Sequence, residues 1–151
     1  MMNTPTSRNS PFTLIELLAV IAIIVILAGI VVGGTAAAQR KAARAKARSE
    51  ISKFELAVEQ YRREWGYLPQ DNALSGNEVT RNFLESIASS DGTPYLNIDE
   101  LRFSGGNWRD PFGRAYLYEQ PGTQNPDSYD VWSEGSDASS AADDIGNFNA
   151  E

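Results

Sequence analysis

The chain has 151 residues, a formal charge of −7 and neither cysteine nor histidine. Its length suits one small domain joined to a long helix. The acidic balance argues against nucleic-acid binding. Without histidine or cysteine, a Ser-His-Asp triad, a Cys-His pair and the usual zinc sites are excluded, and no P-loop or dinucleotide fingerprint is present. These exclusions favour a structural or binding protein over an enzyme.

The N-terminal residues form a polar segment followed by an apolar run. Residues 1–11 carry one charge, Arg8, and the run from Phe12 to Val32 also carries one, Glu16. Such a run is about long enough to cross a hydrocarbon core as a helix. Because a carboxylate costs roughly 2.5–3.5 kcal/mol at the membrane centre, Glu16 is predicted to be functional.

Two simpler interpretations of this segment remain open. A secretory signal peptide would be cut after small residues, which residues 36–38 supply, but it would have a shorter apolar centre and no acid. A plain single-span anchor would use the Gly29-x-x-x-Gly33 pattern as a helix contact. Neither interpretation needs Glu16.

One long helix is predicted over residues 12–64, because no proline interrupts them. The adjacent Gly33 and Gly34 have the lowest helix propensity in this stretch. Residues 12–38 are apolar on all sides, whereas beyond Gln39 the apolar residues recur at steps of three and four, which predicts one buried face: Ala47, Ile51, Phe54, Val58, Tyr61 and Trp65. Gly66 is a suitable C-terminal cap.

The remaining residues predict a small mixed head. A short helix is expected over residues 78–89, capped by Asn77 and buried through Val79, Phe83, Leu84 and Ile87. Three short strands are expected over residues 101–103, 115–119 and 129–133, followed by an acidic loop over residues 134–151. The fold class is therefore α+β, with a long N-terminal helix packed on a small three-stranded antiparallel sheet.

Two motifs resemble those of the type IV pilins and pseudopilins. The first is the polar leader followed by Phe12-Thr-Leu-Ile-Glu16. The second is Trp108-Arg109-Asp110-Pro111-Phe112-Gly113, followed by Tyr116 and Tyr118, which is similar to a segment of the major pseudopilin of type II secretion. Phe112 replaces the second tryptophan of that segment, and Pro11 stands where the family has glycine.

The resemblance implies a pilin-like fold and a defined life cycle. A prepilin peptidase would remove the leader, residues 1–11, by cutting between Pro11 and Phe12, and would methylate the new amino terminus. Residues 12–38 would span the inner membrane once and later form the filament core, and residues 39–151 would form a periplasmic head. Basic residues concentrated after the span, taken alone, predict the opposite orientation, so this topology rests on the resemblance.

The same resemblance implies partners and a site for assembly. The chain would polymerise with its own copies and contact minor pseudopilins and the inner-membrane assembly platform. Glu16 would pair with the methylated amino group of Phe12 on a neighbouring copy and thereby set the register.

The acidic C-terminal loop is the candidate metal site. Asp137, Asp143 and Asp144 lie in a stretch rich in Gly, Ser and Ala, where carboxylates and carbonyls could together supply the oxygen ligands that calcium prefers. The spacing does not fit an EF-hand, and the residues alone favour a solvated acidic tail. The resemblance implies calcium at these three aspartates, which match the family's ligands.

Two alternatives to a major pseudopilin remain. A type IV pilin or a minor pseudopilin shares most of the same features. A membrane-tethered, calcium-dependent binding module that never polymerises would need neither Glu16 nor cleavage before Phe12.

Overall fold

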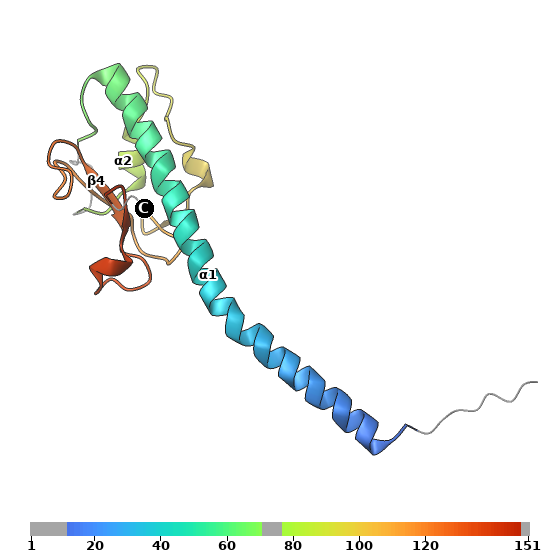
Figure 1. Cartoon of the computed structure of the whole chain (residues 1–151). Helices are drawn as coiled ribbons and strands as arrows, with labels where there is room; N and C mark the ends of the chain where they lie inside the picture. Colours follow the sequence, from blue (N-terminus) through green and yellow to red (C-terminus); the bar gives the residue numbers. More distant parts are fainter. Residues whose placement is uncertain (1–11, 71–76, 149–151) are drawn as a thin grey trace, which may run out of the picture. The chain divides into compact units, whose positions relative to one another are not determined.

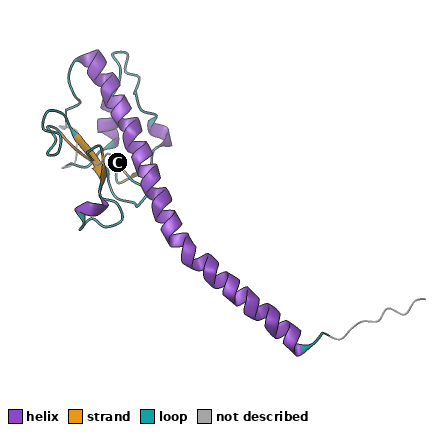
Figure 2. Ribbon diagram, viewed as in Figure 1, coloured by secondary structure: helices purple, strands orange, loops and turns teal. Residues whose placement is uncertain are grey.

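A computed structural model describes residues 12–70 and 77–148, without the side chains of residues 30–34. Figures 1 and 2 show the elements along the chain. The α-helices are α1 (Leu14–Trp65) and α2 (Arg81–Ser86), and the short 3-10 helices are η2 (Ile98–Glu100) and η3 (Ala141–Asp143). The strands are β1 (Phe103–Ser104), β2 (Asn107–Trp108), β3 (Leu117–Glu119), β4 (Asp130–Ser133) and β5 (Ile145–Gly146). This α+β, pilin-like content confirms the predicted fold class.

The long helix is confirmed with small shifts at both ends. α1 begins at Leu14, two residues later than predicted, and continues through Gly33 and Gly34 to Trp65. Gly66 follows with a φ of 80°, and its amide donates to the carbonyl of Arg62 at 2.9 Å. A glycine in the left-handed region is the usual end of an α-helix, so the predicted C-terminal cap is also confirmed.

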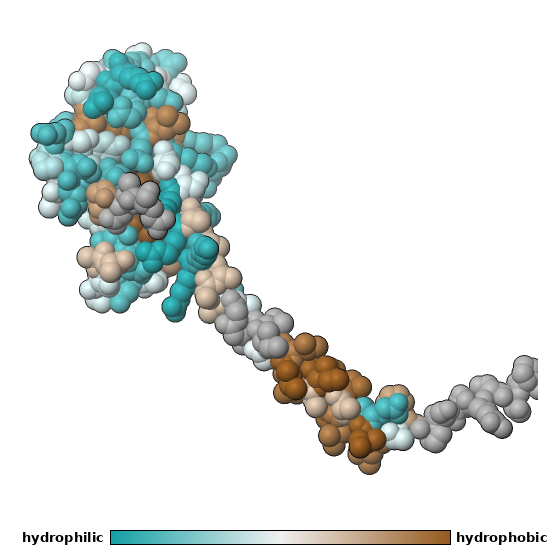
Figure 3. Space-filling model, in the orientation of Figure 1, coloured by the Kyte–Doolittle hydropathy of each residue, from teal (hydrophilic) through white to brown (hydrophobic). Residues whose placement is uncertain are grey.

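The chain divides into two compact units, Met1–Gln39 and Arg40–Glu151, and α1 contributes residues to both. In the first unit, the apolar side chains of α1 from Leu14 to Leu27 are largely exposed, and Figure 3 shows them as an apolar surface. In the part of the chain that the structure describes, no helix meets the length and apolarity that a membrane crossing needs.

The core of the second unit is built on the predicted face of α1. Ala47, Ile51, Phe54 and Val58 are almost fully buried, whereas Trp65 is 41% exposed. The Phe54 ring contacts several other rings, with centroids 5.8–6.4 Å away, and they belong to Phe83, Trp108, Tyr118 and Tyr129. These contacts pack α1 against both α2 and the sheet.

The short helix is shorter than predicted. α2 begins at Arg81, and its cap is Thr80, whose hydroxyl accepts the amide of Phe83 at 3.1 Å. The predicted start at residue 78 was wrong because Val79 is extended and hydrogen-bonds on both sides: its amide donates to Tyr116 and its carbonyl accepts from Trp108, each at 2.8 Å. Burial of the predicted apolar residues is confirmed, from Val79 to Ile87.

The three-stranded antiparallel sheet exists, but its strands differ from those predicted. Its order is β3-β4-β5, with Leu117 opposite Trp132 and Ser133 opposite Ile145. Tyr116 and Tyr118 are buried and Leu117 is only partly so, the alternation that a strand with one buried face shows. The third strand, β5, lies inside the stretch that was predicted to be a loop. It could not be predicted, because two residues are too few to show an alternating pattern.

The first predicted strand belongs elsewhere. It pairs as β1 with β2 in a separate two-stranded hairpin, with Phe103 opposite Trp108. Gly105 and Gly106 connect the two strands, with φ values of 64° and 85°. Two consecutive positive φ values make the tight turn that matches the twist of a hairpin, and glycine adopts them without strain.

Candidate functional site

At the N-terminal candidate site, the start of α1 is closed by a reciprocal pair of side chains. The Thr13 hydroxyl accepts the amide of Glu16 at 3.3 Å, and the Glu16 carboxylate accepts from the amide of Thr13 at 3.4 Å and from its hydroxyl at 3.3 Å. This is a capping box, in which a threonine before the helix and a glutamate three residues later satisfy each other's backbone amides. The pattern Thr13-x-x-Glu16 was visible in the sequence and had not been predicted to cap the helix.

Of the residues predicted to act in cleavage and assembly, the structure describes Phe12 and Glu16. Glu16 lies in the first turn of α1, and the preceding Phe12 is 73% exposed. Pro11 and the predicted leader lie outside the described residues. Because an acid in the first turn also interacts favourably with the helix dipole, Glu16 is satisfied within a single chain.

The motif at residues 108–113 forms a tight turn around a buried carboxylate. Asp110 is fully buried, and its Oδ1 accepts the amides of Phe112 at 2.9 Å and Arg114 at 2.8 Å. The Gly113 amide donates to the carbonyl of Asp110 at 3.1 Å. Asp, Pro and Gly at the first, second and fourth positions are typical of such a turn. Pro111 and Gly113 complete this turn, and sequence reasoning had given no role to the carboxylate of Asp110.

Asp110 also holds the start of the acidic loop. Its Oδ2 accepts a hydrogen bond from the hydroxyl of Ser133, at the end of β4, and the same hydroxyl accepts the amide of Gly135 at 3.1 Å. Gly135 has a φ of 63°, and a Cβ there would lie 2.3 Å from the carbonyl oxygen of Asp143. The loop that contains the candidate metal ligands is therefore wrapped closely on itself.

Asp143 is the most connected of the three predicted ligands. Its Oδ1 forms an ion pair with the guanidinium of Arg44 on α1. Its Oδ2 accepts from the amide and the hydroxyl of Ser136, both at 2.6 Å, and from the amide of Asp137 at 3.0 Å. These hydrogen bonds, with Ser136 first, hold the pKa of Asp143 below its usual value, and Arg44 adds to the effect.

Asp137 and Asp144 lie in different surroundings. Asp137 Oδ1 accepts from the amide of Ser139 at 3.0 Å and from its hydroxyl at 2.6 Å, which lowers the pKa of Asp137. Burial raises the pKa of Asp144, and the negative charges of Glu134 and Asp143 raise it further. The surroundings of Asp144, its burial first, therefore disfavour the ionised form of its carboxyl group.

The structure brings only two of the three predicted ligands into one hollow. Asp137 and Asp143 line a shallow cavity with Arg40, whereas Asp144 lines another, with Trp132 and Phe148. Among residues 12–70 and 77–148, no three acidic side chains converge as a metal site would require. The oxygen donors have the chemistry that calcium prefers, but one oxygen of Asp143 is already paired with Arg44.

The family model and the similar proteins all point to the same family. The family model for type II secretion system protein G matches residues 35–148. The chain is 31% identical over 146 residues to type II secretion system core protein G of Escherichia coli (strain K12), covering 95% of this chain and 93% of that protein. It is 30% identical over 148 residues to the core protein G of Aeromonas hydrophila, covering 94% of each.

Proposed function

This chain belongs to the type II secretion system protein G family, and from that membership we propose that it is made as an inner-membrane precursor and polymerises into the pseudopilus. The family supports the role of a structural subunit of the pseudopilus. The observation that supports polymerisation best is the exposed first section of α1. Its apolar side chains are 46–82% exposed in a single chain.

Burial of these side chains supplies the driving force. Fully burying a leucine or isoleucine stabilises by about 1.5–3 kcal/mol, so α1 is expected to lie in an apolar environment at every stage. In the precursor this environment would be the membrane, which the helix would cross once with the head in the periplasm. In the filament it would be the α1 helices of neighbouring copies.

Glu16 would specify how those helices meet. Prepilin peptidase would cut between Pro11 and Phe12 and methylate the amino group of Phe12. On docking, the carboxylate of Glu16 would accept from that amino group on the neighbouring copy. Because an unpaired charge in a low-dielectric core costs several kcal/mol, only the register that pairs both charges would be stable.

Calcium at the acidic loop is the second part of the proposal. Asp137, Asp143 and Asp144, together with backbone carbonyls of residues 134–144, would hold the ion. Calcium would supply a divalent charge that draws these oxygens together. Burial raises the pKa of Asp144 most, and repulsion from Glu134 and Asp143 adds to it. Calcium would relieve that repulsion and would compete with Arg44 for Asp143. Arg44 ties the loop to α1 in the present arrangement.

The partners follow from the assembly role. Minor pseudopilins and the inner-membrane assembly platform would contact the growing filament, and prepilin peptidase would act once on each precursor. The family name supports assembly with other components of the secretion system.

Determining the N-terminus of the membrane-extracted protein tests this proposal. Mass spectrometry is expected to find a chain that starts at N-methylated Phe12. A chain that keeps Met1 when coexpressed with an active prepilin peptidase would contradict processing. It would leave a membrane-tethered module that does not polymerise.

A further inference from the structure

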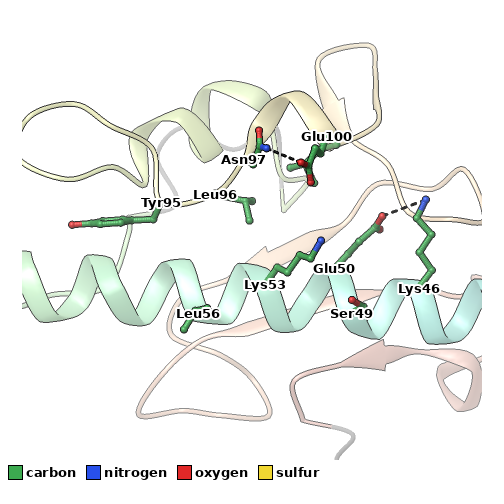
Figure 4. A pocket seen from close by; sticks show the side chains of 10 residues that line it. Lys46, Ser49, Glu50, Lys53, Leu56, Tyr95, Leu96, Asn97 and Glu100 are labelled. Atoms are coloured by element: carbon green, nitrogen blue, oxygen red, sulfur yellow. Dashed lines mark hydrogen bonds and ion pairs between the residues drawn. The ribbon is translucent and has the colours of Figure 1, made fainter.

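A groove in the second unit lies between α1 and residues 95–101 (Figure 4). Its volume is about 430 Å3. Lys46, Glu50 and Lys53 line it from one side at steps of four and three residues, which places them on one face of α1. The side chains of Leu96 and Glu100 belong to the opposite wall.

Most charged groups of this groove already have partners. The carboxylate of Glu50 accepts from the hydroxyl of Tyr116 at 2.6 Å and lies 3.8 Å from the ammonium of Lys46. The carboxylate of Glu100 accepts from the side-chain amide of Asn97 at 2.8 Å. Both acids in the groove are therefore held by groups of the same chain.

Lys53 is the exception. Its side chain is exposed and is directed from α1 into the groove (Figure 4). Within the residues that the structure describes, its ammonium has neither a hydrogen bond nor an ion pair. Among the described residues that line the groove, Lys53 is therefore the one cation without a partner. Lys46 is paired with Glu50, and the carboxylate of Glu100 is held by a neutral amide.

Apolar side chains lie next to this charge. Leu56, one turn further along α1, is 60% exposed, and Leu101 on the opposite wall is partly exposed. Leu56 is a large exposed aliphatic side chain on a head whose other leucines are buried or partly buried in the described region. An acidic side chain flanked by apolar groups fits these features best.

We propose that this groove binds an acidic segment from residues 65–151 of a second copy of the chain. Residues 65–151 contain fifteen acidic residues and four arginines, whereas residues 39–64 contain eight basic and four acidic residues. An acid of the second copy pairs with Lys53 while its neighbouring side chains cover Leu56. The proposal rests on the proposed role as a pseudopilus subunit.

The geometry of this contact suits a filament. The groove of one copy and the acidic segment of the next are different surfaces, so the contact is heterologous. A heterologous contact that does not close into a ring produces an open helical polymer. The groove therefore provides a contact between heads that is separate from the pairing of Glu16 with Phe12.

Charge variants of the full-length, processed protein test the contact. Lys53→Glu is expected to lower the yield of sheared filaments about fivefold, the loss that corresponds to one exposed ion pair at the strong end of the usual range. Lys53→Arg is expected to preserve the yield. The matched control is Arg63→Glu, which makes the same charge change at an exposed residue of α1 outside the groove. Unchanged assembly of Lys53→Glu, or an equal loss in Arg63→Glu, would overturn the proposal.

Site-specific crosslinking identifies the occupant. Because the chain has no cysteine, Leu56→Cys gives one attachment site for a thiol-reactive benzophenone. In wild-type-like filaments, mass spectrometry is expected to find crosslinks to residues 65–151 of a second copy. Crosslinks only to another protein, or none at all, would refute the groove contact. A wild-type chain that forms no filament would instead count against the proposed function.

Discussion

Glu16 takes part in one interaction within the chain and in another in the proposed filament. Single substitutions can test the two interactions separately. In one chain it closes the capping box with Thr13, and in the proposed filament it pairs with an amino group. Glutamine preserves a capping box but carries no charge. The role in assembly therefore predicts that charge, and not capping, is essential.

We expect Glu16→Gln and Glu16→Ala to enter the membrane normally and to lose filament assembly. Thr13→Val removes the capping hydroxyl, keeps the charge, and is expected to assemble at near the wild-type yield. Sedimentation of sheared filaments against total membrane protein measures this. Wild-type assembly of Glu16→Gln would show that the carboxylate serves only to cap α1.

The buried carboxylate of Asp110 is expected to stabilise the head through its hydrogen bonds. Asp110→Ala leaves two backbone amides and the Ser133 hydroxyl without their acceptor, in a fully buried place. Because unsatisfied buried groups cost about 1–3 kcal/mol each, we expect the free energy of unfolding of the soluble head to fall by at least about 3 kcal/mol. Urea denaturation measures it.

Asp110→Asn provides the matched control. The asparagine carbonyl can accept the same two amides, and its amide can donate to the Ser133 oxygen. We expect a loss of about 1 kcal/mol. An equal loss in both variants would mean that the charge of Asp110, rather than its hydrogen bonds, stabilises the turn.

In the acidic loop, the folded structure disfavours the ionised form of one carboxyl group, that of Asp144. Since the pKa of Asp144 is raised, its ionised form is less favourable in the folded chain than in the unfolded chain. This part of the stability is lost as pH rises through the folded pKa and is recovered below the unfolded value near 3.8. Asp137 and Asp143, whose pKa values are lowered, have the opposite dependence.

Asp144→Asn should therefore stabilise the head at pH 7 when a chelator is present. The same substitution removes a proposed calcium ligand, so the added stability from calcium should decrease. Thermal melting of the soluble head, with chelator and with calcium, measures both effects. A variant that melts below the wild type in chelator would show that the Asp144 carboxylate stabilises the loop.

The elements also show how far local sequence patterns reach. The buried face of α1 was predictable because six apolar residues repeat at helical spacing, and Gly66 ended the helix as expected. β5 was not, because Ile145 and Gly146 become a strand only by pairing with Trp132 and Ser133 of β4. The two adjacent glycines, Gly105 and Gly106, are a turn signal that is visible in the sequence. The predicted strand before them, however, pairs with β2 and is not part of the three-stranded sheet.

In the candidate sites too, contacts between residues close in sequence could be predicted, and contacts between distant residues could not. The capping box of Thr13 and Glu16 spans three residues and follows from the sequence. The ion pair of Arg44 and Asp143 joins residues 99 positions apart, and no local pattern predicts it. Grouping of the three aspartates was inferred from resemblance, and the folded chain places Asp144 in a separate hollow.

At the scale of the whole molecule, the acidic loop connects to the rest of the head at both ends. Asp110 holds its beginning through Ser133, and Arg44 holds Asp143 near its end. β5 then returns the chain to the sheet beside β4. Binding of the proposed calcium ion to the loop should therefore change the stability of the entire head.

We expect calcium to raise the melting temperature of the soluble head, from about Arg40 onward. Binding only to the folded state adds RT ln(1 + [L]/Kd), about 2.7 kcal/mol at a hundredfold excess over Kd. For a domain of this size that corresponds to a rise on the order of 10 °C. Magnesium should substitute poorly, because it requires a tighter octahedron and sheds water reluctantly.

Arg44 makes this prediction specific to the present structure. Because its guanidinium occupies one oxygen of Asp143, Arg44→Gln should lower the melting temperature in chelator and increase the rise that calcium produces. Asp143→Ala should remove that rise, and it should expose residues after Glu134 to protease whether or not calcium is present. Identical melting curves in calcium and in chelator would exclude the metal site. The ion pair with Arg44 would then be what holds the loop against α1.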